Sequence, residues 1–254
     1  MEVKVFFAGS DNYFYLLWDE PGRALAVDPP ESEQILDFLE DNELSLAEIL
    51  VTHHHCDHTS GVEELKKKTG CVVIGPDPDR SPAIDRLVKD NETLLLGPWQ
   101  VRVIAVPGHT TTSVAYYVEP FEDNPGLVFT GDTLFVNGCG RILGGNGQTM
   151  WHSLEKLAAL PEDTEVYCGH DYAEENYRFA LEFDPENDQI RQRLKEVRLL
   201  NKEKKPTVPT TIGLEKSLNP FLRAENLTIR KAVHMEQAKA WEVFAELRNR
   251  KDSF

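Results

Sequence analysis

The chain has 254 residues, of which 41% are hydrophobic and 28% are charged, which is typical of a globular protein with a sizeable core. The formal net charge of -16 opposes binding to the phosphate backbone of nucleic acids, so we expect no nucleic-acid partner. No segment approaches the roughly 18 apolar residues of a membrane span, and charged and polar residues interrupt the apolar start before an export signal forms. We therefore expect a protein that neither crosses nor binds a membrane.

The four cysteines are widely spaced and form no CxxC pair; they are Cys56, Cys71, Cys139 and Cys168. Because a chain of this length has no need of disulfide bonds, these cysteines favour a reducing compartment. We expect a cytoplasmic location, with an organelle matrix as the alternative, and a monomer.

Up to about residue 171, short β-rich runs alternate with turns and a few amphipathic helices. The predicted strands cover residues 3–7, 13–18, 24–28, 48–52, 71–75, 99–106, 113–118, 126–132 and 165–170. The predicted helices cover residues 32–41, 62–69 and 149–160. So many strands with so few helices indicate packed sheets flanked by helices rather than a simple βαβ repeat.

The pattern becomes helical after residue 172. Helices are predicted over residues 173–183, 188–204 and 224–250, and a proline-marked loop is predicted over residues 205–221. This part indicates a small helical domain appended to the β-rich one.

The stretch "ILVTHHHCDHTSG", residues 49–61, gathers four histidines and an aspartate after an apolar run. We predict that the strand delivers them onto a loop. Because alternate residues leaving a strand point the same way, His53 and His55 can converge on one ion, while Asp57 and His58 face a neighbouring point. Imidazole and carboxylate groups together are the ligands of a hydrolytic zinc or iron centre. A plain polar loop is the alternative, but four imidazoles without partners would be costly to bury.

Three further ligand candidates stand at the ends of predicted strands: His109 in "VIAVPGHT", Asp132 in "LVFTGDT" and His170 in "EVYCGH". Each alone is compatible with ordinary turn chemistry. Together with the cluster they give five histidines and two aspartates, which is enough for two metal ions. Two divalent cations lower the pKa of bound water to about 7, so no Ser or Cys nucleophile is needed.

The motifs "THHHCDH", "GHT", "GDTLF", "GCGR" and "GHDY", in that order and spacing, resemble those of the metallo-β-lactamase superfamily, and specifically of the glyoxalase II (hydroxyacylglutathione hydrolase) family. The segments "NPFLR" and "LRNRKDSF" are similar to the C-terminal part of that family. The resemblance implies an α/β fold, a four-layer αββα sandwich at residues 1–172, followed by a helical domain at residues 173–254 that contributes to substrate binding. It also implies hydrolysis of S-D-lactoylglutathione to glutathione and D-lactate, the second step of methylglyoxal detoxification.

The resemblance also implies roles for individual residues. One metal ion would be held by His53, His55 and His109, and the other by Asp57, His58 and His170, with Asp132 bridging the two. Asp57 and Asp132 are the expected catalytic groups. The metals are expected to be zinc, with iron or manganese as alternatives. The remaining histidines, His54, His152 and His234, match no ligand motif and are expected to be structural.

Glutathione carries two carboxylates, so the resemblance places its contacts at Arg141, Tyr172, Arg248 and Lys251. The alternative is that Arg248 and Lys251 are the solvated end of a helix, where cations favour the macrodipole. Five positions depart from the family pattern: Cys56, Ser113, Leu143, Gly144 and Gly145. These departures concern the thiol-carrier specificity more than the metal chemistry.

Several alternatives remain open at this point. A related enzyme with the same fold would act on another substrate, as a hydrolase of another thioester, a lactonase or a persulfide dioxygenase. A nuclease would add basic surface, and a secreted β-lactamase would need an export signal. A binding module would keep the fold without catalysis. A nucleophilic Cys56 or Cys139 would need an imidazole partner, which the ligand assignment leaves to neither.

Overall fold

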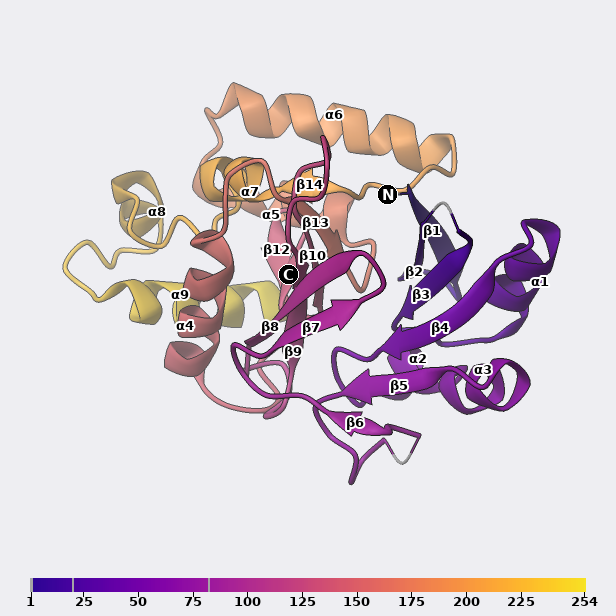
Figure 1. Ribbon diagram of the computed structural model, residues 1–254. Helices are drawn as coiled ribbons and strands as arrows, with labels where there is room; N and C mark the ends of the chain where they lie inside the picture. Colours follow the sequence, from indigo (N-terminus) through magenta and orange to yellow (C-terminus); the bar gives the residue numbers. More distant parts are fainter. Residues whose placement is uncertain (1, 20, 82) are drawn as a thin grey trace. The chain divides into compact units, whose positions relative to one another are not determined.

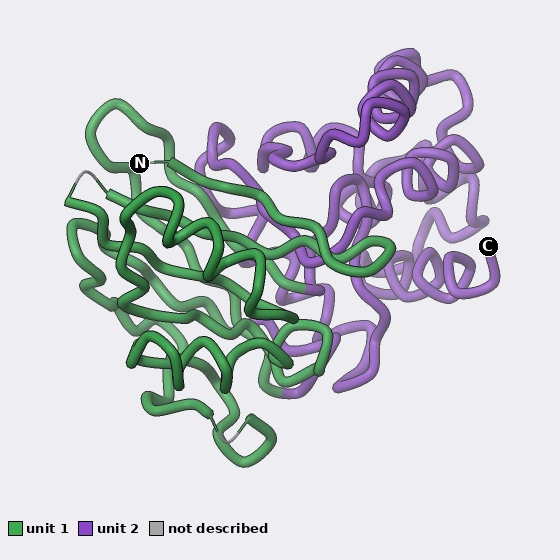
Figure 2. Tube along the Cα trace, turned by 90° about the vertical axis from the view of Figure 1, so that its right-hand side faces the viewer, with its two compact units in different colours: residues 1–105, 112–131 green, residues 106–111, 132–254 purple. Residues whose placement is uncertain are grey.

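The computed structural model describes residues 2–19, 21–81 and 83–254, and the chain forms two compact units. Unit 1 comprises Met1–Ala105 and Thr112–Gly131, and unit 2 comprises Val106–Thr111 and Asp132–Phe254. Figure 1 labels the elements along the chain and Figure 2 colours the two units. Each unit is described by itself below.

The first sheet of unit 1 has six strands in the order β1-β2-β3-β4-β5-β6. The first three strands run antiparallel, whereas β3, β4, β5 and β6 are parallel neighbours. The strands are β1 (Glu2–Ala8), β2 (Asn12–Trp18), β3 (Arg23–Val27), β4 (Ser45–Leu50), β5 (Val72–Gly75) and β6 (Arg86–Leu87). The parallel pairing brings the carboxyl ends of β3 and β4 to one edge, which is where the histidine cluster begins.

Helices α1 (Glu33–Asp41) and α3 (Val62–Thr69) cover one face of this sheet (Figure 1). In β2 the side chains alternate, so that Phe14 and Leu16 belong to the core cluster that also contains Ile35 of α1 and Leu65 of α3. All four are fully buried. Burial of this apolar area is the main stabilising contribution to this half of unit 1.

The second sheet of unit 1 packs on the other face. It contains β7 (Thr93–Leu96), β8 (Trp99–Ala105), β9 (Val114–Val118) and β10 (Leu127–Gly131), all antiparallel. The ring centroids of Tyr15 on β2 and Phe129 on β10 lie 5.2 Å apart, and the hydroxyl of Tyr116 donates to the carbonyl of Val51 at 2.9 Å. The unit is therefore a β-sandwich with helices on the outside of its first sheet.

Unit 2 is largely helical. Its elements are β11 (Leu134–Phe135), β12 (Gly138–Cys139), α4 (Gly147–Ala158), β13 (Glu165–Cys168), α5 (Ala173–Phe183), α6 (Asp188–Lys202), β14 (Thr210–Thr211), α7 (Ile212–Leu218), α8 (Leu227–Ala232) and α9 (Ala240–Asp252). Phe179, Phe221 and Phe244 are buried. Phe179 stacks on Phe221 at a centroid separation of 5.7 Å, and Phe244 meets Phe221 edge-on at 6.0 Å. Asparagine side chains cap α4, α6 and α8, which fixes where these helices begin.

Two of the C-terminal predictions were wrong in detail. The segment predicted as a loop, 205–221, contains β14 and the short helix α7. The single helix predicted over residues 224–250 is two helices, because His234 adopts a φ of 60° and the amide of Met235 donates to the carbonyl of Arg230, which closes the end of α8. A residue in the left-handed region cannot continue an α-helix.

The loop predicted for the histidine cluster is partly helical. Residues Cys56–Thr59 form the short helix α2, with His55 as its N-cap residue. The hydroxyls of Thr59 and Ser60 at the end of this single turn donate back to the carbonyls of His55 and Cys56 at its start. Asp57 and His58 therefore leave a helical turn rather than a loop.

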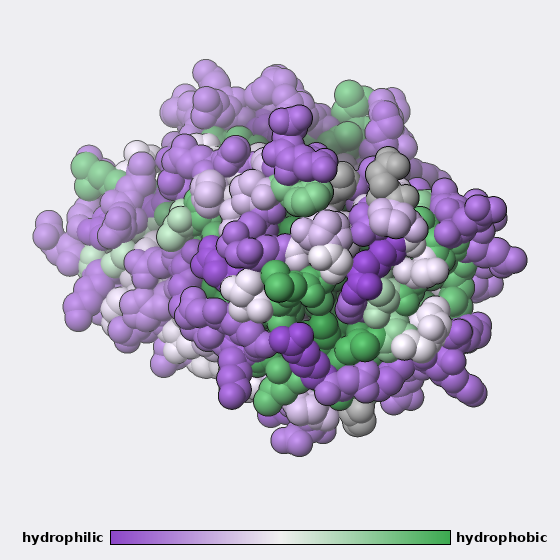
Figure 3. All heavy atoms as spheres, viewed as in Figure 1, coloured by the Kyte–Doolittle hydropathy of each residue, from purple (hydrophilic) through white to green (hydrophobic). Residues whose placement is uncertain are grey.

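Hydrophilic side chains cover most of the face drawn in Figure 3, interrupted by apolar patches. None of the helices within residues 2–19, 21–81 and 83–254 combines the length and the hydropathy that a bilayer crossing requires.

Candidate metal centre

The end of β4 in unit 1 is fixed by a buried aspartate that follows β3. The amide of Thr52 donates to Oδ1 of Asp28 at 2.7 Å, and the Thr52 hydroxyl donates to Oδ2 at 2.5 Å. In return, the amide of Asp28 donates to the carbonyl of Leu50 at 3.0 Å. Asp28 is 3% exposed and Thr52 1% exposed, so these hydrogen bonds are shielded from water. They set the position from which His53 starts.

The same carboxylate orients a second histidine. His58 Nδ1 donates to Oδ2 of Asp28 at 3.1 Å, and both residues are buried. His53 Nδ1 lies 3.0 Å from the Thr52 hydroxyl oxygen, which is itself held by Asp28. Because Nδ1 of each ring has a hydrogen-bond acceptor, Nε2 is the nitrogen that can coordinate a metal ion. Donor atoms of Asp28, His53 and His58 all lie within 4.8 Å of one another.

Unit 1 brings together its four predicted ligands. His53 Nε2 and His55 Nδ1 lie 3.1 Å apart, and Asp57 Oδ2 lies 3.9 Å from His58 Nε2. Asn12 on β2 donates to the carbonyl of Asp57 at 2.9 Å, which ties helix α2 to the sheet. His53 and His58 are buried, whereas 45% of the Asp57 side chain is exposed, so one side of this set faces outward.

Unit 2 brings together the three remaining predicted ligands around one carboxylate oxygen. Asp132 Oδ2 lies 3.4 Å from His109 Nε2 and 3.3 Å from His170 Nε2. His109 Nδ1 donates to the carbonyl of Arg141 at 3.0 Å, so its Nε2 is again the nitrogen that can coordinate a metal ion. All three side chains are at most 8% exposed. Because Oδ2 of Asp132 lies near both imidazole nitrogens, its position suits an aspartate that contacts two metal ions.

The predicted substrate residues lie in unit 2. Tyr172 stacks on His170, with centroids 5.1 Å apart and an interplanar angle of 7°. Arg248 Nη2 donates to Oδ1 of Asp252 at 3.0 Å, and Arg141 Nε lies 3.8 Å from the same oxygen. The two arginines thus meet around one carboxylate. Lys251 makes a short ion pair with Glu175.

The solvated-helix-end interpretation of Arg248 and Lys251 was wrong. Arg248 is 6% exposed, and its Nη1 donates to the carbonyl of Cys139 at 2.7 Å, while its guanidinium lies 5.3 Å from the ring centre of Phe221. Only 7% of the Lys251 side chain is exposed. Both cations are held against the protein rather than in solvent.

Asp28 is the residue that sequence reasoning missed. It is the last residue of the predicted strand 24–28, in the run "ALAVDPP", so the available signal was a carboxylate at a strand end, like that of Asp132. Its φ of 51° lies in the left-handed region, which is uncommon for residues other than glycine and which aspartate adopts more often than most of them. Its role was hidden because the contact with His58 joins residues that are 30 positions apart.

His54 and His152, which were expected to be structural, each contact charged side chains. His54 lies beside Arg80 and Asp77, with Nε2 3.3 Å from Arg80 Nη1. His152 pairs with Glu155 at 2.8 Å. Burial raises the pKa of the Cys139 thiol to about 11, which disfavours a thiolate nucleophile there.

One of the departures has a structural reason. A Cβ at Gly144 would lie 2.2 Å from the amide nitrogen of Thr111, so only glycine fits against this backbone. The amides of Leu143 and Gly144 both donate to the carbonyl of Gly108, beside His109. The Leu143 side chain is 66% exposed and Ser113 is buried.

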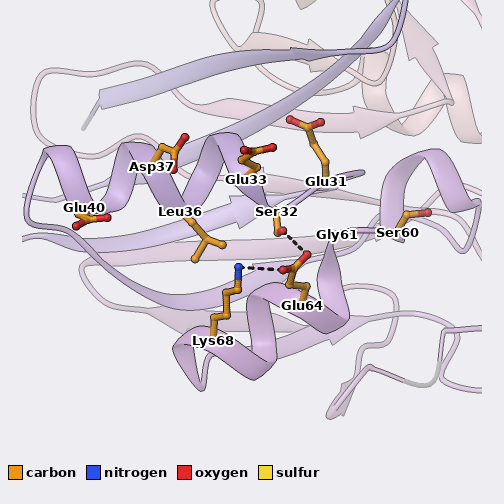
Figure 4. A pocket seen from close by; sticks show the side chains of 10 residues that line it. All are labelled: Glu31, Ser32, Glu33, Leu36, Asp37, Glu40, Ser60, Gly61, Glu64 and Lys68. Carbon is orange, nitrogen blue, oxygen red and sulfur yellow. Dashed lines mark hydrogen bonds and ion pairs between the residues drawn. The ribbon is translucent and has the colours of Figure 1, made fainter.

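A cavity of about 840 Å³ opens between α1 and α3 in unit 1, lined by the ten residues labelled in Figure 4. Glu64, one of the lining residues, accepts a hydrogen bond from Ser32 at 2.6 Å and pairs with Lys68 at 2.9 Å. The other charged side chains along its wall are acidic. None of the described residues lining it is one of the seven predicted ligands, so the cavity is distinct from the candidate centre.

Comparison with known proteins defines the class. Residues 9–170 match the family profile described as metallo-beta-lactamase superfamily, and residues 171–254 match the one described as hydroxyacylglutathione hydrolase C-terminus. The crystal structure of ETHE1 from Myxococcus xanthus is similar with a TM-score of 0.71 at 26% identity, covering 98% of this chain and 90% of that one. The BLEG-1 B3 metallo-beta-lactamase structure shares the fold, with a TM-score of 0.65, 24% identity, and coverage of 87% and 99%. The chain thus has the α/β metallo-β-lactamase fold with a C-terminal helical region.

Curated relatives narrow the assignment. Proteins named hydroxyacylglutathione hydrolase from Brucella ovis and Brucella canis are 44% identical over 257 residues, covering 100% of this chain and 98% and 97% of theirs. The chain belongs to the hydroxyacylglutathione hydrolase (glyoxalase II) family, which confirms the resemblance inferred from its motifs.

Proposed function

We propose that this protein is a metal-dependent thioester hydrolase that converts S-(2-hydroxyacyl)glutathione, with S-D-lactoylglutathione as the reference substrate, to glutathione and a 2-hydroxy acid. The observation that carries the proposal is the uninterrupted match to both parts of the family, residues 9–170 and 171–254, together with 44% identity over the full length. In the reaction, a water oxygen bonds to the thioester carbonyl carbon and the C–S bond breaks. The leaving thiolate takes up one proton of the water to give the thiol, and the other proton passes from the carboxylic acid product to solvent.

The ligand sets of the two units support this chemistry. We propose that they close around two divalent ions, with His53, His55 and His109 at one, Asp57, His58 and His170 at the other, and Asp132 at both. The donor set fits, because histidine rings oriented through Nδ1 and ionised carboxylates suit zinc, iron or manganese. When bound, such ions activate water and polarise a carbonyl.

The residues of the chain would then bind the substrate, orient the metal ligands and hold protons at particular atoms. Asp28 and the carbonyl of Arg141 hold protons on Nδ1 of His58 and His109. A thiolate leaving group, with a pKa of about 8.5 for an ordinary thiol, departs with little help from a general acid. This agrees with a site that offers ligands and no separate acid among its proposed residues.

Arg141, Arg248, Lys251 and Tyr172 are the proposed glutathione contacts. Arg141 and Arg248 share Asp252 as their carboxylate partner, so a substrate carboxylate would find two guanidinium groups already gathered. Residues 173–254 are thereby proposed as the domain that contributes to substrate binding, and residues 1–172 as the catalytic domain. We further propose zinc as the metal, a monomer, and a cytoplasmic location.

The test is an assay of the purified protein on S-D-lactoylglutathione, a lactone, a phosphodiester and glutathione persulfide. Thioester turnover, followed by a colorimetric assay of the released thiol, should exceed turnover of the others. Arg248→Ala and Lys251→Ala should each raise KM for the thioester. Arg250→Ala is the matched control, because Arg250 lies on the same helix and pairs with Glu246 at 2.7 Å.

Two results would overturn the assignment. Absence of thioester turnover in metal-replete protein would show that the protein does not catalyse the proposed reaction. Thioester turnover that is indifferent to Arg248→Ala and Lys251→Ala would leave a thioesterase whose thiol carrier is not recognised by these cations.

A further inference from the structure

The hairpin β11–β12 in unit 2 lies between Asp132 and Arg141 in the sequence. It is fully buried, and four consecutive residues at its turn and second strand, 136–139, each have a backbone group bonded to a side chain from the C-terminal region. Such a regular arrangement is unusual, because most backbone groups of a hairpin bond to the partner strand or to water.

The four contacts come from four different side chains. Asn176 Nδ2 donates to the carbonyl of Val136 at 3.0 Å, and the amide of Asn137 donates to Oε2 of Glu215 at 2.8 Å. Asn219 Nδ2 donates to the carbonyl of Gly138 at 3.0 Å, and Arg248 Nη1 donates to the carbonyl of Cys139 at 2.7 Å. We call the side chains of Asn176, Glu215, Asn219 and Arg248 the hairpin clamp.

Glu215 is the hub of the clamp. It is 1% exposed, and its two oxygens accept from three donors: the Asn137 amide, Asn219 Nδ2 at 2.8 Å and the Thr210 hydroxyl at 2.9 Å. A carboxylate that accepts three hydrogen bonds in a buried site fixes the groups around it closely. The hairpin turn depends on this support, because Asn137 has a φ of 54° and is 0% exposed.

The hairpin in turn fixes two parts of the candidate centre. The amide of Gly140 donates to the carbonyl of Thr133 at 3.3 Å, and a Cβ at Gly140 would lie 1.9 Å from the carbonyl oxygen of Asp132. The next carbonyl, that of Arg141, accepts the Nδ1 proton of His109. A shift of residues 136–139 would therefore move both the backbone of Asp132 and the acceptor that orients His109.

We propose that the hairpin clamp, with Glu215 at its hub, is a positioning network for the metal ligands Asp132 and His109. The C-terminal region then has a second task besides contacting substrate, because it shapes the metal centre through the hairpin. The proposal rests on the proposed function for the identity of the centre, but its consequence, altered metal binding, needs no substrate.

The experiment replaces Glu215 by glutamine, which keeps the size of the side chain. The new amide NH2 group is a donor, and it faces groups that donate to Glu215 in the wild type. Glu162→Gln is the matched control, because Glu162 pairs with Lys216, the neighbour of Glu215, at the surface. Zinc content after dialysis, zinc affinity by competition with a chelator, and the visible spectrum of the cobalt-substituted protein are measured with circular dichroism as the folding check. Steady-state kcat and KM for the thioester are measured in parallel.

We expect folded Glu215→Gln protein to lose up to about tenfold in zinc affinity, the low end of the loss on replacing a direct hydrogen-bond partner of a ligand, because Glu215 acts through the hairpin. Its cobalt spectrum should change, and kcat should fall more than KM rises. Glu162→Gln should match the wild type. If Glu215→Gln does not fold, Asn176→Ala, which removes only the bond to Val136, takes its place with the same expectations.

Unchanged zinc affinity and cobalt spectrum in whichever of these two variants folds would overturn the proposal. If the wild-type protein showed no thioester turnover, the proposed function would be wrong. The metal measurements would still test the role of the hairpin clamp. The two failures are therefore distinguishable.

Discussion

His58 donates a hydrogen bond from Nδ1 to Oδ2 of Asp28 over 3.1 Å, and both side chains are buried. The Asp28→Asn substitution would place an amide where that carboxylate oxygen accepts from both His58 and Thr52. We expect zinc affinity to fall by about 10- to 100-fold while the fold is retained. Competition with a chelator measures this, and Asp37→Asn on the exposed face of α1 is the control. Equal zinc affinity in Asp28→Asn and wild type would show that Asp28 only braces the strand.

The local part of this site was predictable from sequence. His53, His55, Asp57 and His58 lie within six positions, so the end of one strand was enough to predict that they converge. Strand-end motifs also identified His109, Asp132 and His170, which unit 2 gathers around one oxygen. In both cases the signal was a metal-ligating residue directly after an apolar, buried strand. The regular alternation of side chains along a strand made this signal reliable.

The parts of the site and of the C-terminal fold that could not be predicted depend on contacts between residues far apart in the sequence. Glu215 and Asn137 are 78 positions apart, and no periodicity marks a single glutamate as buried. Helix α7, which carries Glu215, is only seven residues long and follows a proline-rich stretch, so turn chemistry dominated the prediction there. The break after α8 was missed because helix-forming residues surround His234, and only its backbone conformation ends the helix.

The neighbouring histidines His54 and His55 should separate cleanly in a substitution test. His55 Nδ1 faces His53 Nε2 at 3.1 Å, whereas His54 lies beside Arg80 and Asp77. We expect His55→Ala to lose bound metal and most activity. His54→Ala should keep its metal, with activity within about threefold, because the His54 ring nitrogens face Arg80 and Asp77. Metal analysis and thioester kinetics measure both. Loss of metal in His54→Ala would reverse the assignment.

Asp252 competes with substrate for the two arginines in the proposed glutathione site. Its Oδ1 accepts from Arg248 at 3.0 Å and lies 3.8 Å from Arg141, and 44% of its side chain is exposed. Asp252→Asn should therefore lower KM for the glutathione thioester, by a few-fold because exposed ion pairs are weak. The effect should fade at high salt. A rise in KM would mean that Asp252 orients the arginines more than it blocks them.

The cysteines should differ sharply in reactivity. Burial raises the pKa of Cys139 to about 11 and that of Cys168 to about 12, and it also raises that of Cys71, whereas Cys56 is exposed. Because the thiolate is the reactive form, iodoacetamide at pH 8 should label Cys56 in the folded protein and leave the other three unlabelled. Peptide mass spectrometry identifies the sites, with urea-unfolded protein as the control. Labelling of Cys139 at the rate of Cys56 would contradict the buried position of the hairpin.

The charge of Glu215 should give folding stability a defined pH dependence. Burial is the main cause that raises its pKa from 4.5 to about 7, opposed by hydrogen bonds from Asn219, Thr210 and the Asn137 amide and by the charge of Arg193. Since the folded-state pKa is the higher one, the folded protein binds more protons between these values. The contribution of this group is therefore complete below pH 4.5 and is lost as the pH rises through 7.

Glu215→Gln lacks this titration, so the difference in unfolding free energy, wild type minus variant, should fall by about 3 kcal/mol from pH 4.5 to 8. Urea unfolding at a series of pH values, with chelator present in both samples, measures it. Glu162→Gln is again the control, because the hydrogen bond from Lys216 lowers the pKa of Glu162 and its difference should stay flat above pH 4.5. A flat difference for Glu215→Gln as well would mean that the carboxylate is solvated or paired in the folded protein, against its burial among three hydrogen-bond donors.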